Sequence, residues 1–250
     1  MTGFVEIENV THAYGGEGGV IAVDKLTLAI AEGEFAAVVG PSGCGKSTLM
    51  KLVTGLQFPR AGSISVGGQK VVGPLKIAGM AFQAPNLLPW RTTLQNVLFP
   101  LVVQGRLNEA TRAHATTLIR AVGLAGFEHH YPHELSGGMR KRASLIRTLV
   151  YDPPVILMDE PFGALDAQTR MQLQEDLLHL WSLGRKTIVF VTHDIAEAIA
   201  LGDRTLVLSR APARIAGEHR IAIPRPRDVR GIMTHGDFAP LYQHIRAQVQ

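Results

Sequence analysis

The chain has 250 residues, enough to bury a full core as one domain or as a domain with a subdomain. Hydrophobic residues make up 46% and charged residues 18%, which is typical of a rather apolar globular chain, and the net charge of +4 does not require nucleic acid as a partner. The single cysteine, Cys44, excludes an internal disulfide framework and suits the cytoplasm. No apolar stretch approaches the roughly 20 residues that cross a bilayer, so work at a membrane would require a spanning partner chain.

The first part of the chain has the pattern of β-strands. Residues 4–10 alternate apolar and acidic side chains, and the apolar residues of 20–30 indicate a second strand. The glycine-rich segment 15–19 predicts a loop between them. Tyr14 precedes this loop, where its ring could stack on adenine or could equally be a core tyrosine at a strand end.

The strongest motif follows a buried strand predicted over 35–39 and precedes a helix predicted over 47–54. It fits the pattern Gly, four residues, Gly-Lys-Ser/Thr, which is the P-loop. Glycines let backbone N–H groups converge on phosphate oxygens, and the helix N-terminus adds positive potential. Lys46 would reach the terminal phosphates and the Ser47 hydroxyl would bind Mg²⁺. The residues expected to hold the nucleotide here are Gly40, Pro41, Ser42, Gly43, Cys44, Gly45, Lys46, Ser47 and Thr48.

The middle of the chain changes from strands to helices. Further strands are predicted over 62–66, before a Gly-Gly turn, and over 77–82, just before Gln83. The proline-broken apolar segment 84–90 is either an exposed partner surface or a loop folded back on the core. Helices are expected over 93–103, with Pro100 limiting its regularity, and over 108–122 with Asn108 as N-cap.

A second anion-binding motif lies at Leu135-Ser136-Gly137-Gly138-Met139. Ser136 is a plausible N-cap for a helix over 137–150, and Gly137 and Gly138 leave the backbone N–H groups of that helix without covering side chains. One nucleotide cannot easily occupy two such sites in one fold. The simplest solution is that two chains share a nucleotide and that each contributes one site.

Two acidic residues end a continuous apolar strand over 155–158. This is the Walker B arrangement, in which Asp159 would hold Mg²⁺ and Glu160 would polarise the attacking water as a general base. After a helix predicted over 168–183, a strand over 187–191 leads to His193, which is placed to point toward the γ-phosphate region.

The last part of the chain carries fewer functional signals. It is expected to contain a short helix at 195–201, strands at 204–209 and 214–223, and a final helix from about Phe238.

The order of these motifs, together with Gln83 and Leu165-Asp166, resembles that of ABC transporter ATP-binding subunits over about residues 4–215. The resemblance implies that Tyr14 is the A-loop aromatic and that Gln83 is the Q-loop residue, which senses Mg²⁺ and the membrane partner. It also implies that residues 136–139 are the signature that caps the γ-phosphate in the opposite subunit. Asp166 would then belong to the D-loop, and His193 would be the switch histidine.

The segments Pro85–Arg91, Leu135–Met139 and Pro161–Asp166 look like the nitrate, sulfonate and taurine importer branch. Met139 replaces the commoner Gln of the signature, which is normal for that branch. Lys141 stands where the branch usually has Gln, and Ala84 where an acidic residue often follows Gln83.

The resemblance implies an α/β fold, with a RecA-like P-loop NTPase core, an antiparallel β subdomain and an inserted helical subdomain. The core would comprise 1–90 and 151–222, the helical subdomain 91–150 and the tail 223–250. Catalysis would depend on Lys46, Gln83, Glu160 and His193, nucleotide contact also on Tyr14, Ser136, Gly137 and Gly138, and Mg²⁺ binding on Ser47, Gln83 and Asp159.

The implied function is ATP hydrolysis that powers an importer of a small solute, from the cytoplasmic face of the inner membrane. Two copies would close on two ATP molecules, contact permease subunits through the Gln83–Trp90 region and serve a solute-binding protein indirectly. A soluble P-loop kinase is the first alternative, but the signature helix and His193 have no role there. A soluble ABC ATPase of DNA repair or translation is the second, but the chain lacks a second cassette and a long coiled-coil insertion.

Overall fold

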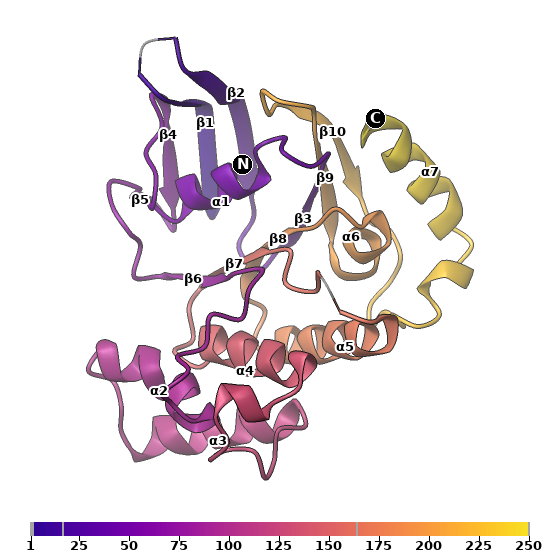
Figure 1. Ribbon diagram of the computed structural model, residues 1–250. Helices are drawn as coiled ribbons and strands as arrows, with labels where there is room; N and C mark the ends of the chain where they lie inside the picture. The colour runs from indigo at the N-terminus through magenta and orange to yellow at the C-terminus, as the bar shows by residue number, and fades with distance from the viewer. Residues whose placement is uncertain (1–2, 17, 164, 250) are drawn as a thin grey trace.

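The computed structural model describes residues 3–16, 18–163 and 165–249 (Figure 1), so Glu17 of the expected glycine-rich loop and Ala164 of the D-loop segment lie outside the described residues. The strands are β1 Val5–Tyr14, β2 Val20–Ile30, β3 Phe35–Val39, β4 Ala61–Val66, β5 Gln69–Lys70, β6 Ala78–Ala81, β7 Val155–Asp159, β8 Thr187–Val191, β9 Arg204–Leu208 and β10 Ile215–Arg220. The helices are α1 Lys46–Val53, α2 Thr93–Val103, α3 Glu109–Ala121, α4 Gly137–Leu149, α5 Ala167–Leu183, α6 Ile195–Leu201 and α7 Phe238–Val249.

The strands form two sheets. The smaller sheet is antiparallel, in the order β2-β1-β4-β5, and the larger has the order β10-β9-β3-β8-β7-β6. All neighbours in the larger sheet are parallel except the β9–β10 pair at one edge. β3 and β8 are buried along their whole length, as expected for central strands of a parallel sheet that is covered on both faces. The expected α/β fold is therefore confirmed.

The parallel strands bring the predicted motifs together. Their carboxyl ends meet at one edge of the sheet, where ligands of open α/β sheets bind. The P-loop follows β3, His193 follows β8, and Asp159 and Glu160 end β7; Gln83 follows β6 closely. Four motifs that lie far apart in the sequence thus follow four adjacent strands.

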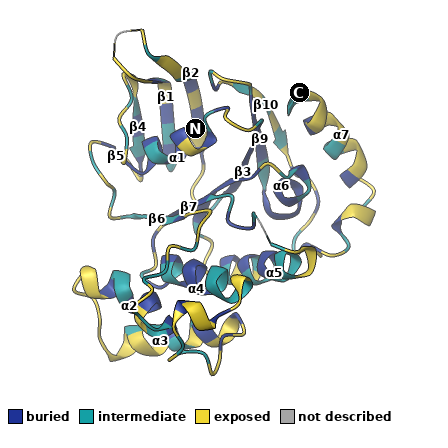
Figure 2. Cartoon of the chain, viewed as in Figure 1, coloured by how far each residue is buried: buried dark blue, intermediate teal, exposed yellow. Residues whose placement is uncertain are grey.

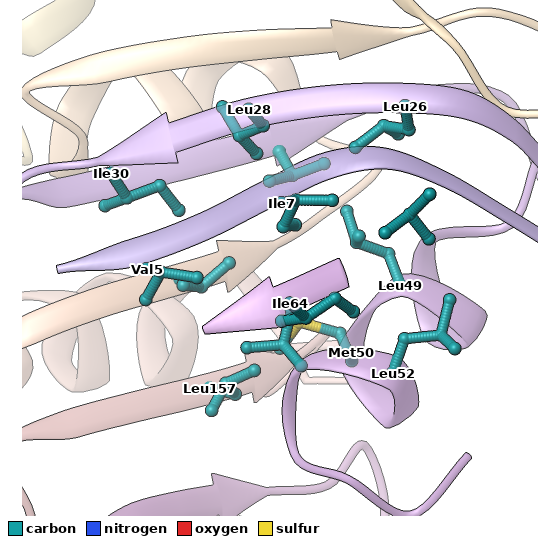
Figure 3. Close-up of a cluster of buried hydrophobic side chains, with 14 of the residues drawn as sticks. Val5, Ile7, Leu26, Leu28, Ile30, Leu49, Met50, Leu52, Ile64 and Leu157 are labelled. Carbon is teal, nitrogen blue, oxygen red and sulfur yellow. The ribbon is translucent and has the colours of Figure 1, made fainter. Parts of the chain in front are cut away.

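Helix α1 is held between the two sheets (Figure 3). Its side chains Leu49, Met50 and Leu52 are almost fully buried and pack in one cluster with residues of β1, β2, β4 and β7. Figure 3 shows Ile7 and Leu157 on opposite sides of this cluster. The P-loop is therefore attached to a helix that the apolar cores of both sheets fix in place.

Helices α2, α3 and α4 share a separate apolar cluster, which contains Leu101, Ile119 and Ile146 and lies in the lower part of Figure 1. Their outward faces are largely exposed (Figure 2). The cluster supports the boundaries 91–150 that we propose for a helical subdomain. Pro100 does not interrupt α2, which continues to Val103, although it lacks the N–H group that a regular helix would use at that position.

The tail packs against the core through its arginines and through α7. Arg227 is buried, and its guanidinium donates to the carbonyls of Ile199, Ile223 and other residues around the end of α6. Burial, together with the neighbouring charge of Arg225, lowers the pKa of Arg227 to about 10. Helix α7 contacts α6, β9 and β10, and Figure 1 shows it along the outer side of that sheet edge.

The described helices are short or carry polar side chains. Among them, none is both long enough and apolar enough to span a membrane.

Phe190 offers a direct test of the parallel-sheet core. It is fully buried on β8 and its ring lies 5.9 Å from that of Phe35 and 5.6 Å from that of Phe162. We expect Phe190→Ala to cost about 3–5 kcal/mol because it leaves a cavity in a covered sheet. Urea unfolding measures this as a lower midpoint. Val103→Ala, which truncates an exposed side chain, is the control, and an unchanged midpoint for Phe190→Ala would contradict this packing.

Candidate functional site

A cleft of about 350 Å³ lies over the P-loop. Its lining comprises Tyr14, Val20, Ile21, Ala22, Ser42, Gly43, Gly45, Lys46, Ser47, Thr48, Glu160 and Ala211. The cleft therefore joins the antiparallel sheet, the P-loop and the end of β7. In the part of the chain that the structure describes, none of residues 136–139 lines it.

The P-loop has the backbone that its glycines allow. Gly43 and Gly45 have φ of +76° and +111°, in the left-handed region that favours glycine. A Cβ added at Gly45 would lie 2.8 Å from the carbonyl oxygen of Ala22, so a side chain there would also collide with β2. Because α1 begins at Lys46, its first N–H groups have no partner within the helix and are available to an anion.

The Lys46 side chain lies within the loop itself. Its ammonium group donates to the carbonyl oxygens of Gly40, at 2.8 Å, and Pro41, at 2.9 Å, and the residue is buried. These two carbonyls accept from two of the three donors of the ammonium group. Phosphate oxygens would offer the same group a charge-assisted hydrogen bond, which is the stronger interaction.

Tyr14 stands at the end of β1 and is 43% exposed. Its hydroxyl lies 2.9 Å from Thr48 Oγ1 and donates to Gln57 Oε1, so the ring stands close to the first turn of α1. Val20, which pairs with Tyr14 across the two strands, is exposed as well. Val20 and Ile21 were not among the residues that we expected to contact the nucleotide. Two exposed apolar residues opposite an aromatic residue are the signal that could have indicated a surface for a flat apolar group.

The acidic end of β7 lies beside the end of β8 and is close to Ser47 and Lys46 of the P-loop. Burial raises the pKa of Asp159, while a hydrogen bond from the Ser47 hydroxyl and the charge of Lys46 act against that shift. Glu160 has a φ of +44°, and its N–H donates to the carbonyl of Val191. His193 Nδ1 lies 3.1 Å from Glu160 Oε2. The structure thus brings together the Ser47–Asp159 pair and the Glu160–His193 pair at one edge of the sheet.

Gln83 lies on the exposed side of this edge. A Cβ added at Gly163 would lie 3.5 Å from Gln83 Nε2, so the amide reaches the turn that follows Glu160. The backbone carbonyl of Gln83 accepts a hydrogen bond from the Lys141 ammonium group. Burial lowers the pKa of Lys141. The unusual lysine therefore joins helix α4 to the Gln83 backbone.

The segment after Gln83 is partly buried and partly exposed. The buried Asn96 accepts from the N–H of Leu88 at 2.7 Å and donates to the carbonyls of Leu88 and Arg91. Trp90, in contrast, is 70% exposed. The backbone of 84–90 is thus held against α2, as for a loop folded back on the core. The ring of Trp90 is exposed, as an exposed partner surface would require.

The two signature glycines differ in their surroundings. Ser136 caps α4 by accepting from the N–H of Met139, as expected. A Cβ added at Gly138 would lie 2.6 Å from Thr169 Cγ2, so a side chain there would require Thr169 of α5 to move. A Cβ added at Gly137 would meet nothing within 4 Å, and Ser136 and Gly137 are exposed. Nothing in the described residues therefore explains the absence of a side chain at Gly137.

Comparison with known proteins identifies the family. The ABC transporter family profile matches residues 23–163. The chain is 45% identical to the taurine import ATP-binding protein TauB of Yersinia pestis, over 83% of this chain and 81% of that protein. It is 43% identical to the nitrate import ATP-binding protein NrtD of Synechocystis, over 88% and 83%. The chain belongs to the ABC transporter family, as an ATP-binding subunit with an ATPase cassette.

Solved structures agree with this result. The dimeric ATP-binding cassette MJ0796 in a post-hydrolysis state, bound to ADP and Pi, superimposes with a TM-score of 0.76 at 33% identity and covers 87% of this chain and 98% of that one. A second dimeric structure of the same cassette gives a TM-score of 0.77. The similarity to the importer branch, which the sequence analysis suggested, is also confirmed by the TauB and NrtD relatives.

Asp159 predicts a measurable effect on stability. An acid whose pKa is raised by folding ionises more readily in the unfolded chain, so its ionisation lowers stability above its ordinary pKa of 3.8. We expect Asp159→Asn to raise the thermal midpoint of the nucleotide-free protein at pH 7, with the gain disappearing as the pH falls toward 4.

Asp166 provides the matched control. It caps α5, and the N–H of Thr169 lowers its pKa. Asp166→Asn is therefore expected to shift the midpoint at pH 7 in the opposite direction. A lower midpoint for Asp159→Asn than for the parent chain would contradict the account of a destabilising buried carboxylate.

Proposed function

We propose that the chain is the ATP-hydrolysing subunit of an importer for a small solute and that it works as a homodimer. Two copies would enclose two Mg·ATP, each between the P-loop of one copy and residues 136–139 of the other. The observation that carries this proposal is the difference between the glycines: Gly138 is explained by packing within the chain, while Gly137 presents a bare helix N-terminus to open space.

The nucleotide would occupy the cleft over the P-loop. The glycine-rich backbone and the start of α1 would bind the phosphates, with Lys46 turning from Gly40 and Pro41 toward them. Tyr14, with Val20 and Ile21 beside it, would contact the base. In this assignment Gly40 to Thr48 line the phosphates, while Ser136, Gly137 and Gly138 reach the γ-phosphate bound by the other copy.

The oxygen groups near β7 fit Mg²⁺, because a carboxylate and a hydroxyl already lie in contact there. Asp159, directly or through water, Ser47 and the Gln83 amide would hold the ion. When bound, Mg²⁺ would neutralise charge on the phosphate oxygens of ATP. Asp159 is costly to ionise in the free chain, and a divalent cation would remove that cost.

Glu160 would act as the general base for the attacking water. Its carboxylate faces the cleft and is held by His193 at 3.1 Å. His193 would fix the direction of that carboxylate and contact the γ-phosphate region. Gln83 would position the water or the ion from the other side. This division of roles matches the observed pairs, in which one carboxylate contacts Ser47 and the other contacts His193.

The Gln83–Trp90 region would contact the permease subunits. Phe82 and Trp90 expose aromatic surface beside a backbone that Asn96 fixes, which suits docking of an apolar partner helix. In this proposal the chain is a peripheral subunit at the cytoplasmic face of the inner membrane. Two relatives are named as taurine and nitrate import proteins. The solute we propose is nitrate, a sulfonate or taurine, delivered by a solute-binding protein.

Gly137→Asp tests the shared site. An acidic residue in the first turn suits the helix dipole, so we expect the fold and thermal midpoint to be kept. The new charge would face the γ-phosphate held by the other copy, so ATP-dependent dimers and ATP hydrolysis should fall to background while one chain still binds ATP. Sedimentation and ATPase assays measure both.

The matched variant is Gly138→Ala, which should instead lower the thermal midpoint because of its contact with Thr169. Full ATPase activity in Gly137→Asp would contradict the shared site.

Glu160→Gln separates binding from chemistry. Loss of a general base should lower the rate of hydrolysis by about 100-fold or more, while ATP affinity is kept. The variant should therefore accumulate as an ATP-bound dimer in size-exclusion chromatography. Normal turnover by Glu160→Gln would show that another group activates the water.

A further inference from the structure

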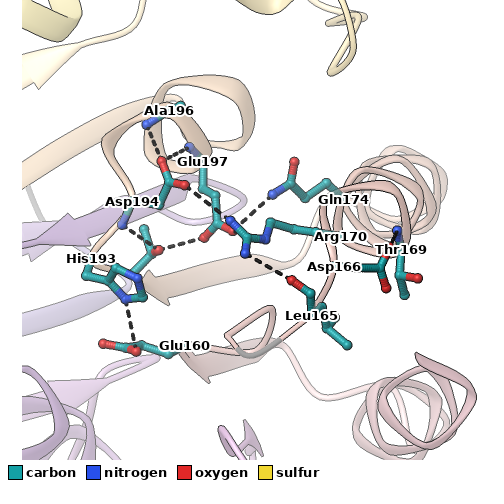
Figure 4. A network of polar contacts seen from close by, with 11 residues as sticks. Glu160, Leu165, Asp166, Thr169, Arg170, Gln174, His193, Asp194, Ala196 and Glu197 are labelled. Carbon is teal, nitrogen blue, oxygen red and sulfur yellow. Dashed lines mark hydrogen bonds and ion pairs between the residues drawn. The ribbon is translucent and has the colours of Figure 1, made fainter. Parts of the chain in front are cut away.

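A buried carboxylate, Glu197, lies behind His193 and has no role in the site described above (Figure 4). It is 6% exposed, accepts from Thr192 Oγ1 at 2.6 Å and accepts from Gln174 Nε2 at 3.1 Å. Thr192 precedes His193, and its hydroxyl also accepts from the N–H of Asp194 at 3.0 Å. Glu197 therefore holds the backbone on both sides of His193 to helices α5 and α6.

Arg170 faces this carboxylate from α5. Its Nη2 donates to the carbonyl of Leu165 at 3.1 Å, which fixes it to the segment that follows the β7 turn. Its other nitrogens lie 3.6 Å from Asp194 Oδ2 and 3.8 Å from Glu197 Oε1. Both distances exceed a hydrogen bond, and Arg170 Nε is buried without a hydrogen-bond partner among the described residues.

This arrangement leaves the buried Nε of Arg170 without a hydrogen-bond partner among the described residues. A buried donor without a partner costs free energy, and the Glu197 carboxylate lies just beyond hydrogen-bond distance of this Nε, as Asp194 does for Nη1. A shift of about 1 Å between α5 and α6 would give charge-assisted hydrogen bonds, whose usual length is about 2.8 Å. A change in the position of α5 relative to α6 would therefore change how strongly Arg170 binds Asp194 and Glu197.

The start of α5 also contacts the signature. Thr169, next to Arg170, is the residue that a Cβ at Gly138 would strike at 2.6 Å. Asp166 caps the same helix turn. A contact made at Ser136 and Gly137 would therefore affect the position of Thr169. Through the neighbouring Arg170 it would also affect α6, the helix that begins just after His193.

We propose that Arg170 is a positioning residue for ATP hydrolysis, which ties the signature face of a chain to the His193 of the same chain. The inference rests on the proposed function, in which residues 136–139 contact the nucleotide bound by the other copy. Arg170 would make the hydrolytic geometry of one site depend on whether the other site is closed.

The test uses the full-length Arg170→Met variant, which keeps length and removes the charge. We expect kcat to fall by up to about 100-fold, the scale of a small misplacement of catalytic groups. The KM for ATP and nucleotide-dependent dimerisation should stay at parent values, and the Hill coefficient for ATP should fall toward 1. Arg170→Lys should recover part of kcat.

Glu197→Gln provides a second variant, which loses the charge and keeps one acceptor oxygen, for either Thr192 or Gln174. It should show the same split between kcat and KM. Glu175→Gln, which neutralises a carboxylate of α5 that pairs with Arg230 of the tail at 2.7 Å, is the matched control and should leave kcat unchanged.

Two results would overturn the proposal: parent kcat in Arg170→Met, or a loss of ATP affinity and thermal stability in proportion to kcat in both network variants. If Arg170→Met is fully active while Glu160→Gln is not, this inference fails and the proposed function stands. If Glu160→Gln is also fully active, the proposed function fails.

Discussion

Helices α1 and α4 both expose backbone N–H groups at their N-termini. Helix α1 begins at Lys46 behind a left-handed glycine, and α4 begins at Gly137, beyond which the described chain leaves open space. Each start presents backbone donors and the positive end of a helix dipole, although in α4 the N–H of Met139 already donates to Ser136 Oγ. Only the first lies in the cleft of its own chain. The parallel sheet fixes the start of α1, and the cluster of α2, α3 and α4 fixes the start of α4. One chain therefore keeps the two helix starts apart.

The site is kept at a cost in stability. Glu160 adopts a positive φ, and Asp159 is a partly buried carboxylate whose ionisation is unfavourable. A strained backbone or a buried carboxylate persists when the surrounding structure holds it in place. Here the hydrogen bond from the Glu160 N–H to Val191 and the buried strand β8 do so. Bound cation and phosphate would relieve the electrostatic part of this cost, so ligand binding and folding stability are linked.

Much of this arrangement could be predicted from the sequence. Apolar runs over 35–39 and 155–158 each end in a motif, and the parallel strands β3 and β7, with β8 between them, bring Lys46 and Asp159 to one edge. The caps at Asn108 and Ser136 also hold. Helix α2 continues through Pro100, because burial of its apolar face outweighs one missing hydrogen bond.

Other features left no pattern in the sequence. Arg170 and Glu197 lie on separate helices, and polar contacts between such elements have no periodicity that could be recognised. The same holds for Arg227, whose partners are backbone carbonyls around α6, and for Lys141, whose partner is the carbonyl of Gln83. The difference between Gly137 and Gly138 required the position of Thr169.

The central claim is that one copy holds only half of each working site. Specific ATPase activity, measured over a dilution series with the association state followed by sedimentation, tests it most directly. The account predicts that activity per chain falls on dilution in step with the dimer fraction and approaches zero for the monomer. Constant activity per chain in a protein that sediments as a monomer throughout would contradict it.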